Sequence, residues 1–179
     1  THLISANSDE TIEMVLAGSC TIGFVGKKPP GRKLNSIPLW KDRLILVLPR
    51  VFPRVSDAPI SPGELFQVPF IIREQGSATR ETPDRYLREH DGRSISDMNV
   101  VAELGSSEAV KEGTLAGLGA SVISAYAVAR EIQQGLICAT PIDGWNLQRE
   151  FYAIYRKKLP MTPPIQLFLD FVTSFPMPG

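Results

Sequence analysis

Apolar runs and amphipathic segments alternate along the chain, and polar turns separate them. The runs with the apolar or alternating pattern of β-strands are residues 3–4, 21–26, 44–48, 69–72, 99–104, 120–123, 136–140 and 148–156. Segments with one apolar face and a polar residue at the start predict helices over 9–17, 61–65, about 82–90, 107–116 and 124–134, and from 162 onward. This alternation predicts an α/β protein in which helix N-termini gather at the carboxyl edge of a sheet.

Two helix predictions depend on single features of the pattern. Pro83 fits an α-helix only in the first turn, so we expect the helix that ends near His90 to begin near Thr82. Ser124 stands in the capping position before residues 125–134. In the last helix, an apolar stripe is expected to face inward, and it consists of Ile165, Phe168, Leu169 and Val172.

The turn after the strand at 69–72 carries the most chemistry in the chain. It has the sequence Arg-Glu-Gln-Gly-Ser-Ala-Thr-Arg over residues 73–80. Gly76 permits a tight turn, and Ser77 and Thr79 bring hydroxyl donors to the start of a helix, where backbone N–H groups are free. Such a turn suits a small anion, which Arg73 and Arg80 can neutralise. The plainer alternatives are a capping turn and ion pairs between these arginines and nearby acids.

Two further turns have the same character. Asn7 and Ser8 precede the first predicted helix, and Ser106 and Ser107 precede the helix over 107–116. Each residue is a candidate ligand donor, and each is equally a candidate N-cap with nothing bound. Three such helix starts that converge on one ligand are typical of a small-molecule sensor or carrier rather than of a catalyst.

Composition and charge narrow the classes of function that this chain is expected to have. The 179 residues are 43% hydrophobic and have a formal net charge of zero, so a basic face for gripping nucleic acid is not expected from this chain alone. No apolar run approaches the roughly 20 residues of a membrane span. The cysteines, Cys20 and Cys138, are expected to be buried free thiols of a reducing compartment.

Catalytic and cofactor chemistry have little support in the sequence. The histidines, His2 and His90, fall in a starting strand and at a polar helix end, so a Ser/His/Asp set is not expected. No Cys/His spacing indicates a metal site, and neither a phosphate-binding loop nor a dinucleotide fingerprint occurs. We therefore expect no enzyme activity, no metal and no cofactor.

Taken in order, a set of motifs resembles the effector-binding domain of LysR-type transcriptional regulators over about residues 3–172. The motifs are Asn7-Ser8, Leu16-Ala17-Gly18-x-x-x-Ile22-Gly23-Phe24-Val25, Pro38-Leu39-Trp40-x-Asp42-x-Leu44-x-Leu46-Val47, Arg73-Glu74-x-Gly76-Ser77-x-Thr79-Arg80, Glu103-Leu104-Gly105-Ser106-Ser107-Glu108-Ala109-Val110 and Ala116-Gly117-Leu118-Gly119-Ala120-Ser121-Val122. The Arg73–Arg80 version looks like the branch that regulates sulfur, nitrogen or carbon assimilation.

The resemblance implies a two-lobed, periplasmic-binding-protein-like (type 2) α/β fold in which helices flank a small mixed sheet in each lobe. Residues 1–43 with 148–179 would form the first lobe, and residues 44–147 the second. A small anionic effector would bind between the lobes, where Ser8, Gly76, Ser77 and Thr79 match positions that line the family's cleft. Binding would then control DNA binding and transcription.

The resemblance also implies partners and a location. We expect a cytoplasmic protein with no membrane partner, a homodimer through this domain and a homotetramer in the full-length regulator. DNA would be held only through an N-terminal winged helix-turn-helix, which is absent from these residues, as are the first strand and helix of the effector domain. An acid common in the family after the first helix is missing, since Gly18 is followed by Ser-Cys-Thr. The alternative function is a periplasmic solute-binding protein of a transporter.

Overall fold

The computed structural model describes residues 2–52 and 59–175, and its chain divides into two compact units. Unit 1 contains Thr1–Lys41 and Arg149–Gly179, and unit 2 contains Asp42–Gln148. Unit 1 holds α1 (Ser8–Ala17), β1 (Ile22–Val25), the first part of β2 (Leu34–Pro49), nearly all of β7 (Gln148–Arg156) and α6 (Pro163–Ser174). Unit 2 holds the rest of β2 with α2 (Pro62–Leu65), β3 (Phe70–Arg73), α3 (Ala78–His90), the 3-10 helix η1 (Ile95–Asp97), β4 (Val100–Leu104), α4 (Ser107–Leu115), β5 (Ser121–Ser124), α5 (Ala125–Gln133) and β6 (Ile137–Thr140).

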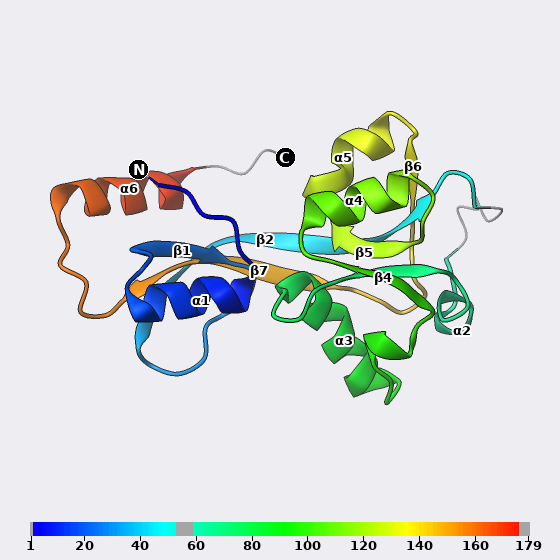
Figure 1. Cartoon of the computed structure of the whole chain (residues 1–179), viewed down its shortest axis with the longest axis horizontal. Helices are drawn as coiled ribbons and strands as arrows, with labels where there is room; N and C mark the ends of the chain where they lie inside the picture. Colours follow the sequence, from blue (N-terminus) through cyan, green and yellow to red (C-terminus); the bar gives the residue numbers. More distant parts are fainter. Residues whose placement is uncertain (1, 53–58, 176–179) are drawn as a thin grey trace. The chain divides into compact units, whose positions relative to one another are not determined.

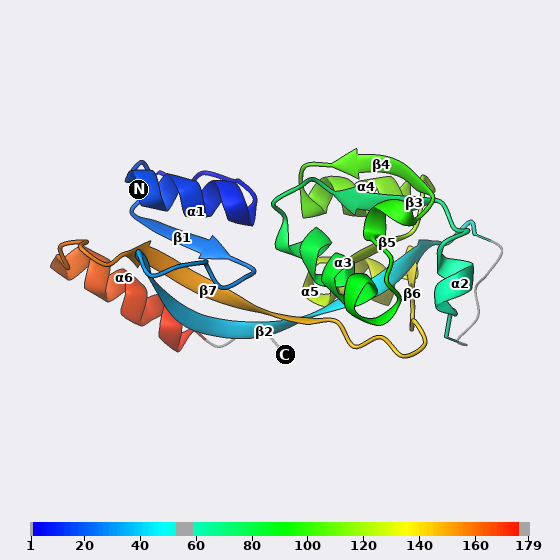
Figure 2. The ribbon, with the colours of Figure 1, turned by 90° about the horizontal axis from the view of Figure 1, so that it is seen from below.

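Unit 1 is built on the antiparallel pair β1–β7, which runs from Ile22 opposite Tyr155 to Val25 opposite Tyr152. Figures 1 and 2 show α1 and α6 on opposite sides of this pair. Alternation along β1 explains the arrangement, because Gly23 lies against α1 while the Phe24 ring meets Phe168 of α6 at 6.2 Å between ring centroids.

Unit 2 is built on a sheet whose inner strand is covered on both faces. β3 pairs in parallel with β4, and backbone bonds join it to the start of β5. β5 and β6 both pair antiparallel with β2. Phe70 and Ile72 enter one apolar core and Ile71 enters the other, so neither face of β3 reaches water. This burial is why the strand reads as a continuous apolar run.

Several expectations from the sequence are corrected by this structure. Leu3 and Ile4 form no strand and are 87% and 55% exposed, because no neighbouring strand among the described residues satisfies their backbone groups. Phe168 does face Phe24 of β1, but it is not buried, since 41% of it is exposed, and Leu169 is the buried residue of that stripe. Cys20 and Cys138 are free but only half-buried.

The predicted start of α3 is also wrong, since the helix begins at Ala78 rather than near Thr82. Pro83 therefore lies in the second turn and is buried there. Its missing N–H removes one helical bond, a local cost that the packing of α3 against β3 and β5 outweighs.

A further correction concerns Ser124, which stands at the N-cap position of α5 but makes no cap bond. Its hydroxyl instead donates to Oδ1 of Asp42 at 2.9 Å. Asp42 is 2% exposed, and a buried carboxylate requires such donors. Ser124 therefore stabilises the start of the unit 2 segment of β2.

Candidate functional site

The turn between β3 and α3 has the geometry of a ligand-binding loop. Gly76 has φ +83°, a left-handed conformation that favours glycine. It places Ser77 at the N-cap position of the 13-residue helix α3 with φ −80° and ψ 124°. The Ser77 carbonyl accepts from the N–H groups of both Arg80 and Glu81, each at 3.0 Å.

The hydroxyl of Ser77 is the most informative group in this turn. Ser77 is 3% exposed, yet its side chain makes no cap bond to α3. Among the described residues, no hydrogen bond of this hydroxyl is recorded. Thr79, two residues further along in the first turn of α3, is 4% exposed. Because every buried side-chain oxygen among the described residues has a hydrogen-bond partner, the Ser77 hydroxyl must reach the surface, where it can donate to another group.

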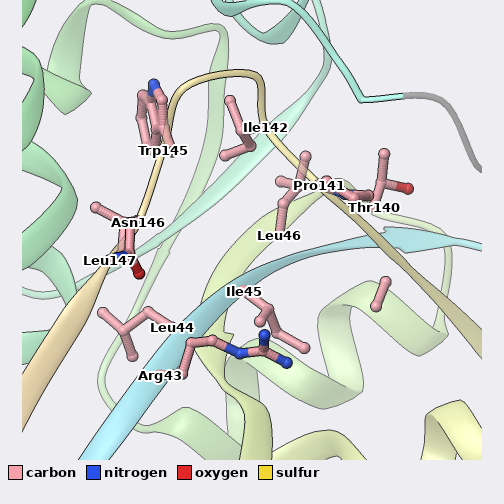
Figure 3. A pocket seen from close by; sticks show the side chains of 11 residues that line it. Arg43, Leu44, Ile45, Leu46, Thr140, Pro141, Ile142, Trp145, Asn146 and Leu147 are labelled. Atoms are coloured by element: carbon pink, nitrogen blue, oxygen red, sulfur yellow. The ribbon is translucent and has the colours of Figure 1, made fainter.

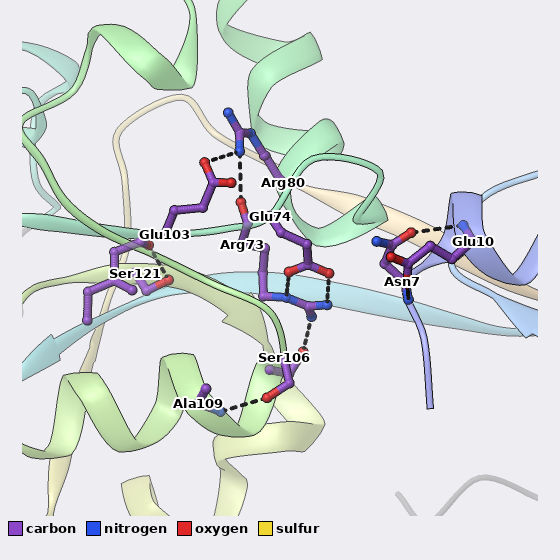
Figure 4. A network of polar contacts seen from close by, with 11 residues as sticks. Asn7, Glu10, Arg73, Glu74, Arg80, Glu103, Ser106, Ala109 and Ser121 are labelled. Atoms are coloured by element: carbon purple, nitrogen blue, oxygen red, sulfur yellow. Dashed lines mark hydrogen bonds and ion pairs between the residues drawn. The ribbon is translucent and has the colours of Figure 1, made fainter. Parts of the chain in front are cut away.

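The arginines of the turn are already engaged (Figure 4). Arg73 binds the Glu74 carboxylate through two bonds of 2.7 Å, from Nε and from Nη2. Arg80 donates from Nη1 to the Arg73 carbonyl at 3.1 Å and to Glu103 Oε2 at 2.7 Å. Of the alternatives open for these cations, ion pairing with nearby acids is the one present in this structure.

The turn between β4 and α4 adjoins the first turn because β3 and β4 are parallel neighbours that end at the same edge. Ser106 is the N-cap of α4, and its Oγ accepts from the Ala109 N–H at 3.0 Å. Ser107 Oγ accepts from Arg73 Nη1 at 2.8 Å. The structure thus brings together Arg73, Gly76, Ser77, Thr79, Arg80, Ser106 and Ser107 in unit 2.

The third predicted turn lies in unit 1 and is engaged in the start of α1. Asn7 Oδ1 accepts from the Glu10 N–H at 3.0 Å, and the Glu10 carboxylate accepts from the Asn7 N–H at 3.1 Å. Ser8 is buried, and its Oγ accepts from the Gly26 N–H at 3.3 Å. Asn7 is therefore the cap, and Ser8 ties α1 to the end of β1.

Sequence reasoning missed Glu103, which fixes Arg80. Glu103 is paired with Ile72 in the β3–β4 register, so only knowledge of that strand pairing places its carboxylate near the turn. The alternation of β4, in which Val101 and Glu103 are exposed, was the available signal that this side chain points outward.

A polar hollow of about 300 Å³ lies beside the turn, along α3 and η1. Its lining includes Gly76, Arg80 and Asp84. Asp84 accepts from Arg88 Nε at 2.8 Å, from Ser94 Oγ at 2.7 Å and from the Ile95 N–H at 2.9 Å. Burial raises the pKa of Asp84, but these hydrogen bonds outweigh that effect and hold the pKa below its ordinary value of 3.8.

We expect Asp84→Ala to lower the free energy of unfolding at pH 7 by about 2 kcal/mol, because a charged acceptor of three bonds is lost. Asp84→Asn, which keeps an acceptor oxygen, should cost about half as much. Since the folded pKa is lowered, the stabilisation is present above the unfolded pKa near 4 and disappears as pH falls through the folded value. Urea unfolding at pH 7 and at about pH 2.5 tests this, and a pH-independent difference between the wild type and Asp84→Asn would contradict it.

A second hollow, of about 270 Å³, lies between β2 and the segment 141–147 (Figure 3). Apolar side chains such as Leu44, Leu46 and Ile142 form most of its wall. Trp145 at its side packs against Tyr86, with ring centroids 5.0 Å apart. This hollow shares no residue with the turns described above, so we do not assign the anion site to it.

Residues 2–52 and 59–175 contain no cluster of three or more His, Cys, Asp or Glu side chains placed to hold a metal ion. None of the helices there combines the length and hydropathy required to cross a bilayer.

The family described as "LysR substrate binding domain" matches residues 1–175. The chain belongs to this family. Members of this family are transcription regulators rather than enzymes. The matched domain is the regulatory part that binds the effector. The fold is accordingly the two-lobed, periplasmic-binding-protein-like type that the sequence predicts.

Known relatives agree with this assignment. The HTH-type transcriptional activator CmpR of Synechocystis is 31% identical over 166 residues, which cover 93% of this chain and 53% of the relative. The chain spans about half the length of the curated relatives it matches. The Synechocystis CcmR regulatory domain in complex with 2-PG has a TM-score of 0.79 at 25% identity, over 94% of this chain and 79% of that one. The effector-binding domain of QuiR in complex with shikimate has the same fold, with a TM-score of 0.78 at 15% identity over 94% and 77% of the two chains.

Proposed function

We propose that this LysR domain senses a small anionic metabolite that binds between its two lobes and thereby controls DNA binding and transcription. In this proposal the lobes are those that the family resemblance implies, residues 1–43 with 148–179 and residues 44–147. The ligand is held by the turns before α3 and α4, together with Asn7 and Ser8 at the start of α1. Relatives in complex with 2-PG and with shikimate support a small-molecule effector.

The observation that carries this proposal is Ser77, a nearly buried residue whose hydroxyl makes no cap bond. Because Arg73 and Arg80 are engaged with Glu74 and Glu103, the anion is recognised mainly by hydroxyls and by the N–H groups of the α3 N-terminus. Sulfate, phosphate, nitrite-like anions and small carboxylates all meet this requirement.

The change in transcription follows from a difference in effector affinity between two arrangements of the lobes. The effector binds one arrangement of the lobes more tightly than another, and only that difference is available for signalling. A difference of about 1–3 kcal/mol is enough for regulation. In the longer protein we place this domain in the cytoplasm, as a homodimer through the domain and a homotetramer overall, with DNA held by the N-terminal helix-turn-helix.

The test is a thermal-shift panel of small anions on the wild type and on two serine variants with opposite expectations. A ligand at 100 times its dissociation constant should add about 2.7 kcal/mol of stability. We expect Ser77→Ala to keep the ligand-free melting temperature and to lose the ligand shift. Ser61→Ala removes a hydroxyl that does cap a helix, α2, so it should lower the ligand-free stability by about 1 kcal/mol and keep the shift.

Two outcomes would argue against the site. One is a ligand shift that survives in Ser77→Ala and Thr79→Ala alike. The other is a loss of ligand-free stability in Ser77→Ala comparable to that in Ser61→Ala, which would make Ser77 an ordinary cap. Ser8→Ala tests the contribution of unit 1 in the same panel.

A further inference from the structure

Unit 1 contains a concentration of positive charge that the neutral net charge of the chain conceals. A hollow of about 430 Å³ is lined by Leu16 and by five cationic residues, namely Arg32, Lys33, Arg156, Lys157 and Lys158. We call it the basic hollow. Its cations come from two segments, one leading into β2 and one at and after the end of β7, and a bond of 3.3 Å from the Lys157 N–H to the Lys33 carbonyl joins them.

The cations of the basic hollow lack acidic partners in the described part of the chain. No Asp or Glu lines the hollow, and none of its five cationic side chains forms an ion pair with a described residue. Elsewhere in the chain the pattern differs, since Lys27, Arg88 and Lys111 each bind a carboxylate at 2.7–2.8 Å. Like charges held together without counter-charge repel one another, and a bound anion removes that repulsion.

One of the five has a local role. Arg156 stands beside Gly18 at the end of α1, where a Cβ built on Gly18 would lie 2.8 Å from Arg156 Nη1. The last turn of α1 has no basic residue of its own, and the partial negative charge of a helix C-terminus favours a cation. The side chains of Arg32, Lys33, Lys157 and Lys158 have no such local role and are available to a ligand.

We propose that the basic hollow binds a compact polyanion with oligophosphate chemistry, of which inorganic pyrophosphate is the simplest example. Its volume falls in the range of small-molecule sites, and its concave form suits a small ligand better than the surface of a nucleic acid duplex. Lysines act there as mobile point charges that can converge on several phosphate oxygens. The hollow shares no residue with the turns proposed for the effector, so either site can fail while the other stands.

The experiment is calorimetric titration of pyrophosphate into the 179-residue chain at low salt in a metal-free buffer. We expect the Lys157→Ala/Lys158→Ala variant to bind at least tenfold more weakly, and the Lys157→Arg/Lys158→Arg variant to bind within about threefold of the wild type. The matched control is Arg50→Ala/Arg85→Ala, which removes the same charge from exposed positions of unit 2 and should leave affinity unchanged. Raising the salt from about 0.05 to 0.5 M should weaken binding roughly tenfold or more, because exposed charges are screened.

Two results would overturn the proposal. The first is equal pyrophosphate affinity in the wild type and in Lys157→Ala/Lys158→Ala, provided that the two proteins melt at the same temperature. The second is binding of a short DNA duplex that depends on Lys157 and Lys158 while pyrophosphate does not bind, which would make this face a nucleic-acid surface. Pyrophosphate binding that persists in Ser77→Ala but fails in the lysine variant supports the basic hollow independently of the effector site.

Discussion

Replacement of Gly119 by Ala is expected to lower the free energy of unfolding by about 2–4 kcal/mol. Gly119 lies just before β5, and a Cβ there would come within 2.7 Å of the Pro69 carbonyl oxygen and 3.0 Å of its carbon. These atoms belong to the backbone, so no side-chain rotation relieves the overlap. The Ala120 N–H donates to the same Pro69 oxygen, and the Ile71 N–H donates to Ala120 O, each at 2.8 Å. Relief of the overlap therefore requires movement of the backbone that joins β3 to β5.

Urea unfolding of Gly119→Ala beside Gly63→Ala measures this effect. Gly63 lies in α2 with open space around it, so Ala there should leave stability unchanged or raise it slightly. An unfolding midpoint of Gly119→Ala equal to that of the wild type would show that β3 and β5 can separate at no cost. The ligand shift should survive in any folded fraction, because Gly119 belongs to neither proposed ligand site.

The strands of unit 2 could be predicted from sequence because their environment is uniform. Residues 44–48 and 69–72 are apolar without alternation, and both lie in strands buried on two faces. Local chemistry also located the helix starts at residues 7–8 and 106–107, although it left open which residue of each pair is the cap, which is Asn7 and Ser106 in the structure. Elements of this kind depend on neighbours in the sequence and on burial alone.

Predictions failed where the outcome depends on what lies across the fold. The Leu3–Ile4 run has the composition of a strand, but a strand requires a paired neighbour. Phe168 belongs to the apolar stripe of α6, and the stripe does not say which of its residues is covered. Ser124 looks like a cap, but the demand of a buried Asp42 from a distant segment decides the partner of its hydroxyl.

The location of the candidate site could be predicted from the sequence, but its hydrogen-bond network could not. The sequence put Arg73, Ser77 and Ser107 at the ends of strands, and the parallel β3–β4 pair brings their turns to one edge. It did not distinguish the serine that caps, Ser106, from the one that does not, Ser77. That distinction depends on side-chain rotamers, which residue type and spacing do not determine.

The last prediction decides whether Arg73 braces the site or binds the ligand. Its guanidinium makes two bonds to Glu74 and one to Ser107, so it connects the turn before α3 to the start of α4. We expect Arg73→Ala to lower the free energy of unfolding by about 2–3 kcal/mol without ligand, because charge-assisted bonds in a half-buried position are lost. Arg73→Lys should recover less than half of this loss, since an ammonium cannot reproduce the planar two-point contact with a carboxylate.

A double-mutant cycle of Arg73→Ala with Glu74→Gln, followed by chemical denaturation, isolates the pair from other effects of truncation. A coupling energy of about 1–2 kcal/mol identifies Arg73 as a brace. If ligand-free stability is instead unchanged in Arg73→Ala while the ligand shift disappears, Arg73 contacts the anion directly. The brace result has a consequence for specificity. With Arg73 committed to Glu74 and Arg80 to Glu103, the proposed anion would be recognised by the Ser77 hydroxyl and the helix N–H groups, which select by size and geometry more than by charge.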